Sequence, residues 1–403
     1  MDHSILMVLD EPFPPDIRVE NEARSLIGAG FRVTVLSIAP PARGTTQSGE
    51  ERWNGIDIIR VRIRRQLRNK MRGLVASVPA LELFVSHHIL RVCRQRHVDV
   101  LHMHDLWLFG AGLRASRRLG IPVVGDLHEN FTHALTQYAW STRFPGKWVV
   151  NIKRWKKLEK QWMQALGCLI CIVQEQQDRV IKLGVPRSRC VLWPNTISVQ
   201  AFDSYEVDQE LVASLRSDFT IVYTGGINLH RGLDTLLKAM PAVLRHCDAR
   251  LVIVGEGRIR PELEELADSL GIAGRVSFTG WQKLNLIKSY ILGADVGVVP
   301  HVKSTHTDAG MPHKLFQYLY LKRPAVVSDC IPMQRIVEGN QCGLVFPSGD
   351  AGALGEALLT LYHDPELRAR MGMNGCKAVV SRYNWDATAQ PAIAMYRGLF
   401  AAA

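Results

Sequence analysis

Segments with the pattern of β-strands alternate with segments of helical pattern from one end of this chain to the other. At its start, the apolar Ile5–Leu9 is followed by Arg18–Ala29, which has helical periodicity and glycines at its end, and then by the apolar Arg32–Ile38. Strands that alternate with helices form parallel sheets that are covered by helices on both faces. The alternation therefore predicts an α/β fold.

The alternation continues through both halves of the chain. Further strands are predicted at Ile56–Ile63, Val100–His104, Val123–Leu127, Cys168–Val173, Thr220–Tyr223, Arg250–Val254, Val276–Thr279, Val296–Val299, Ala325–Ser328 and Gly343–Phe346. Further helices are predicted at Pro79–Arg96, Ala111–Leu119, Leu233–Leu244 and Pro261–Leu270, and one more ends at Leu183. Two such runs of about 190 residues predict two doubly wound domains, with a polar linker near Thr196 to Asp218.

Composition places the chain among soluble globular proteins. Its 403 residues are 47% hydrophobic and 22% charged, which excludes disordered, collagen-like and disulfide-stapled chains. The most apolar stretch, Gly73 to Val85, holds Glu82 and is shorter than the about 20 residues of a membrane span. The first residues show no secretory signal, and the eight cysteines are scattered apart from Cys168 and Cys171. We therefore expect buried, reduced thiols in a cytosolic protein.

The net charge of +11 lies entirely in the first half of the chain. Residues 1–200 hold 29 Lys and Arg against 17 Asp and Glu, whereas residues 201–403 hold 20 against 21. Much of the excess lies in two segments, Arg52 to Arg72 and Lys147 to Lys160. The second segment combines its cations with the tryptophans Trp148, Trp155 and, just beyond it, Trp162.

This mixture of cations and tryptophans allows two interpretations. A helix with a basic face and an aromatic edge can lie on an anionic membrane. Alternatively, the cations form a solvated face and the tryptophans turn into the core. We expect an anionic membrane surface as a partner and a location on the inner face of the cell membrane. We expect no nucleic acid partner, because the sequence has no nucleic-acid recognition motif.

Polar residues follow the predicted strands of the first half. Ligands of paired doubly wound domains bind at the carboxyl ends of strands, here in a predicted central cleft that the two domains face. Asp16 and Arg18 lie in or just after the proline-rich loop that follows the first strand. His104 and Asp105 stand at the end of the strand that begins at Val100.

The next strand ends in Asp126-Leu127-His128-Glu129. Alternation along the strand places Asp126 and His128 on the same side. A histidine at a strand end can donate a hydrogen bond to a sugar hydroxyl or stabilise developing charge. A structural histidine, or a metal site made of two histidines and an aspartate, is the alternative.

Two loops of the second half have the features of phosphate sites. Gly225 and Gly226 follow a strand, and Arg231 stands just before the next helix, so backbone amides and a guanidinium can meet a diphosphate. The long loop after Val299 leads into a helix that begins with His313 and Lys314. Gln317 lies one turn after Lys314 on the same helix face, where it can bind a ribose hydroxyl.

With these segments in view, the chain resembles the retaining glycosyltransferases of family 4, which have the GT-B architecture. The motifs that carry the resemblance occur in order along nearly the whole chain. They are P-P-D-I-R-V-E-N-E-A-R-S-L, D-L-H-E, Y-T-G-G-x4-R-G-L-D-T-L-L, L-V-I-V-G-E-G, V-S-F-T-G-W, A-D-V-G-V-V-P, P-H-K-L-F-Q-Y-L-x4-R-P-A-V-V-S-D and the final Y-N-W-D.

The resemblance implies two Rossmann-like domains with different substrates. Residues 1–198 would bind the acceptor, residues 199–382 would bind the nucleotide sugar, and 383–403 would form a helix that crosses back to the first domain. His128 matches the family histidine that contacts the donor sugar and helps the transition state. Arg231 takes the place of a lysine on the donor diphosphate, and Gln317 takes the place of a glutamate on the ribose.

The site that the resemblance implies has four groups of residues. We assign catalysis to His128, Asp126 and Glu129; the diphosphate to Gly225, Gly226, Arg231, His313 and Lys314; the nucleotide to Gln317, Gly255, Trp281, Met311 and Pro312; and the acceptor to Asp16, Arg18, His104 and Asp105. The sequence has no D-x-D motif, so we expect neither a metal nor another cofactor. The family's usual arginine is Gly226 here, and its paired glutamates fall on Ala309 and Gln317.

The function predicted from these observations is retaining transfer of a hexose from a UDP- or GDP-sugar. The acceptor would be lipid-linked or a polysaccharide. Two alternatives stay open. One is another chemistry of the same architecture, a nucleotide-sugar epimerase or a phosphorylase. The other is a non-catalytic partner that binds a nucleotide sugar, which the uncharged Gly226, Ala309 and Gln317 suggest.

Overall fold

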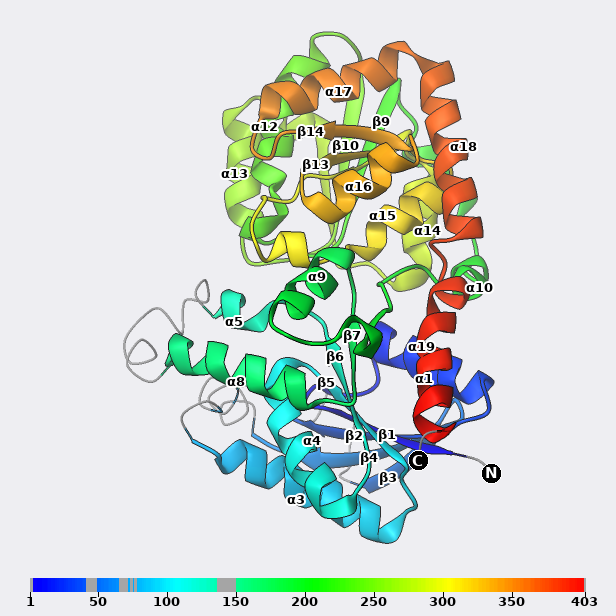
Figure 1. Cartoon of the computed structure of the whole chain (residues 1–403). Coiled ribbons are helices and arrows are strands. Elements are labelled where there is room, and N and C mark those ends of the chain that lie inside the picture. The colour runs from blue at the N-terminus through cyan, green and yellow to red at the C-terminus, as the bar shows by residue number, and fades with distance from the viewer. Residues whose placement is uncertain are drawn as a thin grey trace. The chain divides into compact units, whose positions relative to one another are not determined.

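The computed structural model describes residues 3–40, 49–64, 72, 75, 78–135 and 150–401 (Figure 1). The chain forms two compact units. The first consists of Met1–Pro194 and Thr388–Ala403, and the second of Asn195–Ala387. Each unit is described by itself below.

The first unit is built on an eight-stranded sheet with the order β3-β4-β2-β1-β5-β6-β7-β8. All neighbouring strands are parallel except β3 and β4. Strands β2 and β4 lie on one side of β1, and β5, which comes next in the main sheet, lies on the other side. The strand order therefore reverses between β1 and β5, and in folds of this kind ligands bind at the carboxyl ends of the strands beside such a point. The strands are β1 (Ser4–Leu9), β2 (Arg32–Ala39), β3 (Gly49–Trp53), β4 (Ile56–Arg62), β5 (Val100–His104), β6 (Val123–Leu127), β7 (Cys168–Cys171) and β8 (Cys190–Leu192).

Helices cover this sheet. Helix α1 packs on β2, whereas α4 packs on β5 and β6 and also contacts α3 and α8. Asp16 begins α1 by accepting hydrogen bonds from the amides of Arg18 and Val19, both at 3.1 Å. The helices are α1 (Ile17–Gly28), α3 (Ala80–Gln95), α4 (Leu106–Leu119), α5 (Phe131–Ala134), α8 (Ile152–Ala165), α9 (Gln174–Lys182) and the last helix, α19 (Trp385–Ala401), which enters the first unit at Thr388.

The second unit has a six-stranded, fully parallel sheet with the order β11-β10-β9-β12-β13-β14. Its strand order reverses between β9 and β12, so the loops after these two strands lie side by side at the edge where ligands bind. The strands are β9 (Phe219–Thr224), β10 (Ala249–Val254), β11 (Val276–Gly280), β12 (Val296–Val299), β13 (Ala325–Ser328) and β14 (Gly343–Phe346).

Two groups of helices flank the second sheet. Helix α12 contacts both α13 and α17, and α15 contacts α14, α18 and β12 (Figure 1). Gly232 begins α12 in the left-handed region, with φ of 64°, and a Cβ there would lie 1.9 Å from the carbonyl oxygen of Pro300. The helices are α10 (Val199–Asp203), α11 (Gln209–Ser214), α12 (Leu233–Leu244), α13 (Arg260–Ser269), α14 (Leu284–Leu292), α15 (His313–Tyr320), α16 (Ile331–Gly339), α17 (Ala351–His363) and α18 (Pro365–Ser381).

The predicted α/β fold is confirmed, and most expected strands are found within two residues of their predicted bounds. Helix α4 begins at Leu106 instead of Ala111, because the apolar residues before Ala111 are buried and continue the helix. The strands β3 and β8 were not expected. The segment expected as a linker, Thr196 to Asp218, contains α10 and α11 and belongs to the second unit.

Two further expectations concern membranes and thiols. Within the described residues, no helix is both long and apolar enough to cross a bilayer. Cys168 and Cys171 are buried free thiols on β7, and burial raises the pKa of both. Part of each basic segment, including Arg65, Lys70 and Trp148, lies outside the described residues.

Candidate functional site

A buried polar network lies at the carboxyl edge of the first sheet, and Asp126 at the end of β6 is its centre. The Arg18 Nε and Nη2 atoms donate to Oδ2 and Oδ1 of Asp126 at 3.1 and 2.8 Å. Arg18 Nη2 also lies 2.8 Å from Glu22 Oε1, and Nη1 donates to the carbonyl of Trp193 at 3.0 Å. Arg18 is only 6% exposed, so it holds Asp126 in place instead of facing an acceptor as we expected.

His128 is the member of the network that reaches the surface, with 24% of its side chain exposed. Its Nε2 lies 2.9 Å from Asp126 Oδ2 and 3.2 Å from His104 Nδ1, and its Nδ1 lies 3.7 Å from Asp105 Oδ1. Burial favours the neutral ring, but the carboxylates of Asp105 and Asp126 outweigh it and raise the pKa of His128 to about 10. His128 is therefore a cationic hydrogen-bond donor at neutral pH.

The two aspartates beside His128 differ in protonation. Burial favours the neutral form of Asp126, yet Arg18 and His128 hold the pKa of its carboxyl well below the usual range. Burial raises the pKa of Asp105 to about 7, although the charge of His128 opposes this shift. Asp126 is therefore a fixed negative charge, whereas Asp105 can exchange a proton near neutral pH.

The network also contains a set of side chains with the spacing of a metal site. One ligand atom from each of Glu22, His102, His104 and Asp126 lies within 4.8 Å of the others, and all four residues are buried. However, Arg18 binds both carboxylates and the imidazolium of His128 binds Asp126, so two cationic groups already face these two acids. A divalent ion would add charge beside them, and the arrangement favours the metal-free interpretation.

The last helix contributes a residue to this network that sequence reasoning missed. Tyr396 Oη lies 2.7 Å from His102 Nδ1, and both side chains are fully buried. Nothing in the sequence pairs two residues that are 294 positions apart. The contact explains why α19 packs in the first unit.

The second unit carries a cluster of basic side chains where its strand order reverses. Lys314, in the first turn of α15, is 8% exposed, and its Nζ lies 3.8 Å from the ring centre of Tyr223 at the end of β9. A Cβ at Gly225 would lie only 2.7 Å from Nζ, so the ammonium group fits here because residue 225 is glycine. Burial, followed by the charge of Arg231, lowers the pKa of Lys314 well below its usual value. An anion bound here would stabilise the charged form of Lys314 and offset the repulsion from Arg231.

Arg231 provides the second cation of this cluster. Its Nη1 donates to His301 Nε2 at 2.9 Å, and its Nε is buried without a hydrogen-bond partner. His301 follows β12 and is 4% exposed. Among the residues that the structure describes, no carboxylate forms an ion pair with Arg231 or Lys314. The cluster is therefore a site with uncompensated positive charge, as a diphosphate requires.

Comparison with known proteins agrees with this geometry. The family model described as Glycosyltransferase Family 4 matches residues 17–201, and the model described as Glycosyl transferases group 1 matches residues 218–364. The chain belongs to the family 4 glycosyltransferases. It is thus a sugar-transferring enzyme with the GT-B fold.

Individual relatives of this glycosyltransferase are distant. It is 25% identical over 295 residues to an α-D-kanosaminyltransferase of Streptomyces kanamyceticus, which covers 70% of this chain and 72% of that protein. It is 27% identical over 312 residues to a phosphatidyl-myo-inositol mannosyltransferase of Mycobacterium leprae, with 74% and 73% covered. The structure of sucrose-phosphate synthase from Thermosynechococcus elongatus matches all of both chains with a TM-score of 0.78 at 19% identity.

The remaining residues assigned to the glycosyltransferase site are less tightly grouped. Glu129 is partly buried and adds negative charge near Asp105. Gly226 accepts a hydrogen bond from Tyr223 Oη at 2.8 Å, and a Cβ at Gly255 would lie 2.0 Å from the Gly225 oxygen. Four others lie in or just before α15: Met311 is buried, while His313 and Gln317 are partly exposed, and Pro312 precedes the helix.

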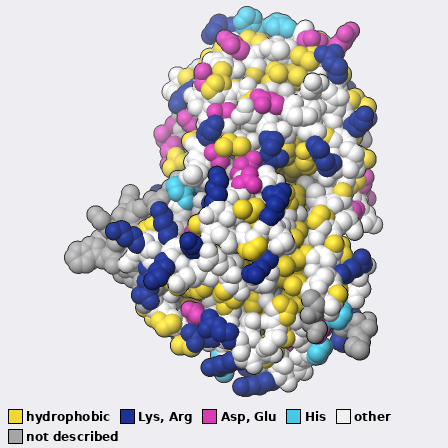
Figure 2. Space-filling view, in the orientation of Figure 1, with side chains coloured by type: hydrophobic (Ala, Val, Ile, Leu, Met, Phe, Trp, Pro, Cys, Tyr) yellow, Lys and Arg dark blue, Asp and Glu magenta, His cyan; other side chains and the backbone are white. Residues whose placement is uncertain are grey.

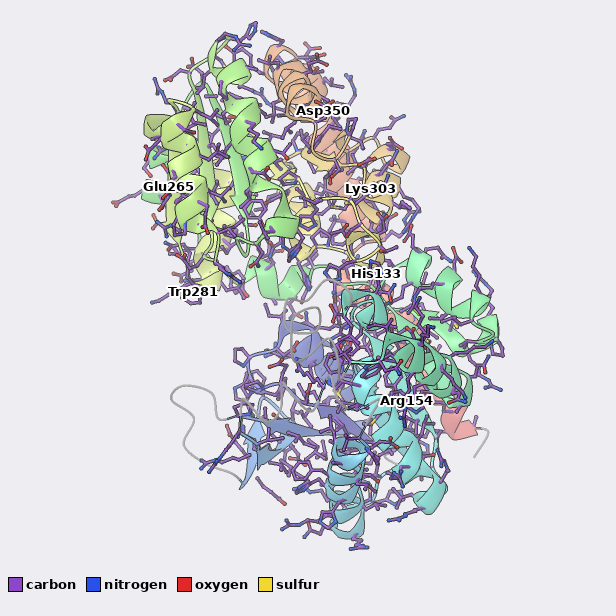
Figure 3. The ribbon with its side chains drawn as sticks, turned by 90° about the vertical axis from the view of Figure 1, so that its left-hand side faces the viewer. His133, Arg154, Glu265, Trp281, Lys303 and Asp350 are labelled. Atoms are coloured by element: carbon purple, nitrogen blue, oxygen red, sulfur yellow. The ribbon has the colours of Figure 1, made fainter. Side chains whose placement is uncertain are left out.

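Trp281 lies apart from the basic cluster. It follows β11, which is an edge strand, and is 75% exposed (Figure 3). The histidines His230, His301 and His306 were not assigned to the site in advance. A signal existed, because all three lie in the two loops that follow β9 and β12, but the family motifs do not include them.

Helix α8 has a basic face without an aromatic edge. Lys153, Arg154, Lys156, Lys157 and Lys160 are exposed. Figure 2 shows Lys and Arg side chains gathered over this part of the surface. The expected aromatic edge is wrong for Trp155 and Trp162, which are 0% and 7% exposed, because the amphipathic helix buries its tryptophans in the core.

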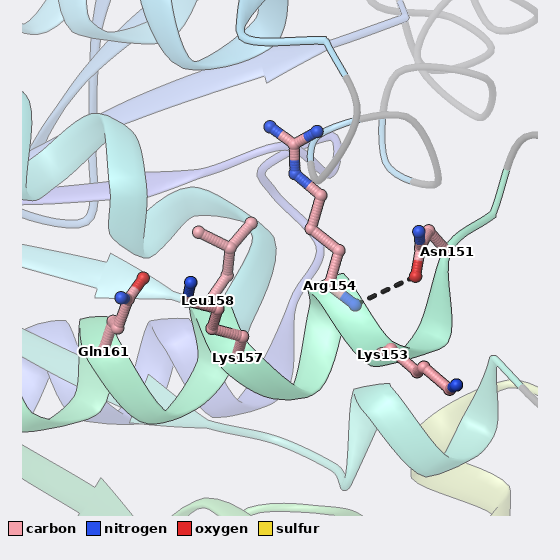
Figure 4. Close-up of a pocket in the computed structure, with 6 residues that line it drawn as sticks. All are labelled: Asn151, Lys153, Arg154, Lys157, Leu158 and Gln161. Carbon is pink, nitrogen blue, oxygen red and sulfur yellow. Dashed lines mark hydrogen bonds between the residues drawn. The ribbon is translucent and has the colours of Figure 1, made fainter.

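A hollow of about 550 Å³ lies along this face (Figure 4). Five of the six residues that line it are of polar or cationic type: Asn151, Lys153, Arg154, Lys157 and Gln161, with Leu158 as the sixth. Asn151 begins α8 by accepting a hydrogen bond from the amide of Arg154 at 3.0 Å. The basic face therefore begins at a well-capped helix start.

Proposed function

We propose that this enzyme transfers a hexose from a UDP- or GDP-sugar to a lipid-linked or polysaccharide acceptor with retention of configuration. The second unit binds the donor and the first unit binds the acceptor. The observation that carries the proposal is the pair of cations Arg231 and Lys314, which no described carboxylate neutralises. Lys314 is buried against Tyr223 and packs directly on Gly225, an arrangement that is costly unless an anion completes it.

Transfer breaks the bond between the anomeric carbon and the diphosphate oxygen, and the electron pair stays on the diphosphate. Arg231, Lys314 and the amides at the start of α15 stabilise that charge. The acceptor oxygen forms the new bond on the same face of the sugar, and its proton passes to the leaving phosphate oxygen. His128, held by Asp126 at 2.9 Å, offers a hydrogen bond to a sugar hydroxyl.

The first experiment is a thermal-shift screen of the protein with UDP, GDP and ADP and their common sugars. A ligand at 100 times its Kd adds about 2.7 kcal/mol to the unfolding free energy, which is measurable. We expect one nucleotide to stabilise the protein and the shift to disappear in Arg231→Ala and Lys314→Ala. The exposed Lys377→Ala is the matched control. No stabilisation by any nucleotide would contradict the donor assignment.

A second experiment separates transfer from the alternatives. NMR of the product with the selected donor and an acceptor panel gives the anomeric configuration. An inverted product would refute retention, and conversion of the donor without an acceptor would indicate an epimerase. Binding without turnover across the panel would favour the non-catalytic partner that the uncharged Gly226, Ala309 and Gln317 first suggested.

The basic face of α8 supports an anionic acceptor or membrane surface. A cation near an anionic membrane contributes about 1 kcal/mol of binding free energy, so removing two weakens binding about 30-fold. We expect this loss for the double variant Lys156→Gln and Lys157→Gln in cosedimentation with phosphatidylglycerol vesicles. The exposed pair Arg117 and Arg118 on α4, changed in the same way, is the control. Equal loss in both variants would remove α8 from the proposal.

A further inference from the structure

The basic cluster of the second unit contains three histidines in addition to Arg231 and Lys314. The ring centres of His230 and His301 lie 6.5 Å apart, and those of His230 and His306 lie 5.7 Å apart. His230 is partly buried beside Arg231, and His301 is almost fully buried. The proposed diphosphate site uses only Arg231 and Lys314, so the histidines need a separate explanation.

The hydrogen bond between Arg231 and His301 fixes the protonation of one ring nitrogen. A guanidinium can only donate, so Nε2 of His301 accepts at 2.9 Å and carries no proton. A phosphate oxygen that accepts from Arg231 Nη1 competes with this ring nitrogen. Once released, the imidazole of His301 can take up a proton and donate to the same phosphate.

The electrostatics of the loops agree with this exchange. Burial, followed by the charges of Lys314 and Arg231, lowers the pKa of His301 well below its usual value. Burial, Arg231 and His306 lower the pKa of His230 to about 4. Both rings are thus neutral in the free protein at neutral pH, and added negative charge raises both pKa values.

The acidic groups on neighbouring elements do not offset this positive charge. Asp308 on the same loop as His306 accepts a hydrogen bond from the Ile331 amide at 2.8 Å. Asp329 after β13 forms an ion pair with Lys303 at 2.8 Å. The hydroxyl of Tyr223 donates to the Gly226 carbonyl. Among the described residues, the charges that shift the pKa of His230 and His301 come from Arg231, Lys314 and neighbouring histidines.

We propose that the donor site is proton-linked: the diphosphate of the nucleotide sugar binds together with a proton that His301 or His230 takes up. This inference rests on the proposed function of the second unit. It adds that pH regulates the affinity of that unit for the nucleotide sugar. The protonated imidazole gives the diphosphate one more N–H hydrogen bond than the neutral ring of the free protein could give. Donor affinity therefore rises as pH falls through the neutral range.

Calorimetry of nucleotide-sugar binding tests this directly. UDP-glucose and GDP-mannose are suitable probes, because their diphosphates are diesters that do not titrate near neutral pH. Titrations at pH 6.5 in two buffers of different ionisation enthalpy give the number of protons exchanged. We expect clear net uptake, and a Kd that rises with pH by up to tenfold per unit.

Glutamine variants identify which histidines take up the proton on binding. In the double variant His301→Gln and His230→Gln, the amide at 301 can still accept from Arg231, so binding persists but uptake and the pH dependence of the Kd fall away. The exposed His363→Gln leaves both unchanged. If the buried His301 variant does not fold, the partly exposed His230→Gln alone must reduce the uptake.

Three results would overturn the inference. They are binding without proton exchange, proton release, and uptake that persists in the histidine variants but disappears in Lys314→Met. Failure of the folded protein to bind either probe, or any nucleotide of the thermal screen, would instead overturn the proposed function on which this inference rests.

Discussion

Lys314→Met separates the stability of the second unit from its function. Lys314 is 8% exposed, and among the described residues it forms no ion pair. Methionine has a similar length and keeps the apolar contact with Tyr223, which lies 3.8 Å from Nζ. The change therefore removes a buried charge at little cost in packing.

We expect Lys314→Met to raise the free energy of unfolding by about 1–2 kcal/mol, or roughly 2–8 °C in Tm for a unit of this size. Burial lowers the folded-state pKa of Lys314 below 10.5, its value in the unfolded chain. The unfolded state thus binds the extra proton, and wild-type stability increases as pH rises toward 10.5. The advantage of the variant is largest near neutral pH and shrinks in the alkaline range.

The same variant loses a charged hydrogen bond to the donor. Such a bond contributes about 1.5–3 kcal/mol, so nucleotide-sugar affinity falls about 10- to 150-fold. Urea unfolding between pH 7 and 9.5 and calorimetry with the selected donor measure the two effects, with the exposed Lys377→Met as control. A variant that is destabilised throughout this range, or that binds donor normally, refutes the reasoning.

Three other predictions concern residues that the structure places unambiguously. We expect His128→Gln to lower kcat about 10²- to 10⁴-fold. We also expect NMR to find the wild-type ring cationic up to about pH 9, so that its contribution to the unfolding free energy is complete below pH 6.5 and is lost as the pH rises toward about 10. A ring that titrates near pH 6.5 would contradict the assignment. Arg18→Met leaves buried carboxylates without their partner and costs about 3–5 kcal/mol in chemical denaturation, whereas Arg24→Met removes an exposed pair and costs less than about 1 kcal/mol. Gly232→Ala costs at least about 2 kcal/mol, because its Cβ meets the Pro300 oxygen, whereas Gly274→Ala, with open space around it, stays within about 0.5 kcal/mol; equal effects would contradict the backbone argument.

The sequence predicted the sheet architecture well because parallel strands are nearly continuous apolar runs. Val100–His104 and Val123–Leu127 were predicted with their observed bounds, and all ten residues are buried. Strand β3, whose residues Gly49–Trp53 are mostly exposed and charged, has no such pattern, so only its pairing with β4 reveals it. Hydrophobic sequence patterns thus indicate which strands are buried. They miss exposed strands, which only their hydrogen bonds to a neighbouring strand define.

Within the site, sequence reasoning found residues but misjudged their orientation. Alternation correctly placed Asp126 and His128 on one side of β6. It did not show that Arg18 points inward to Asp126, because that contact spans 108 positions. Similarly, the basic and aromatic residues of α8 were identified together, but which of them faces the core depends on the packing of Trp155 and Trp162 against the first sheet's core.

The two polar clusters differ in how their charges are balanced, and this difference indicates their roles. In the first unit, Arg18 and His128 face Asp126 within hydrogen-bond distance, so the protein itself supplies the opposite charges and holds His128 in one orientation. In the second unit, Arg231 and Lys314 have only neutral or cationic neighbours within the described residues. Paired charges need no ligand to balance them, whereas buried cations without an opposite charge destabilise the fold until an anion binds. Donor binding should therefore stabilise the second unit more than the first, and domain-resolved hydrogen exchange with and without nucleotide sugar would show it.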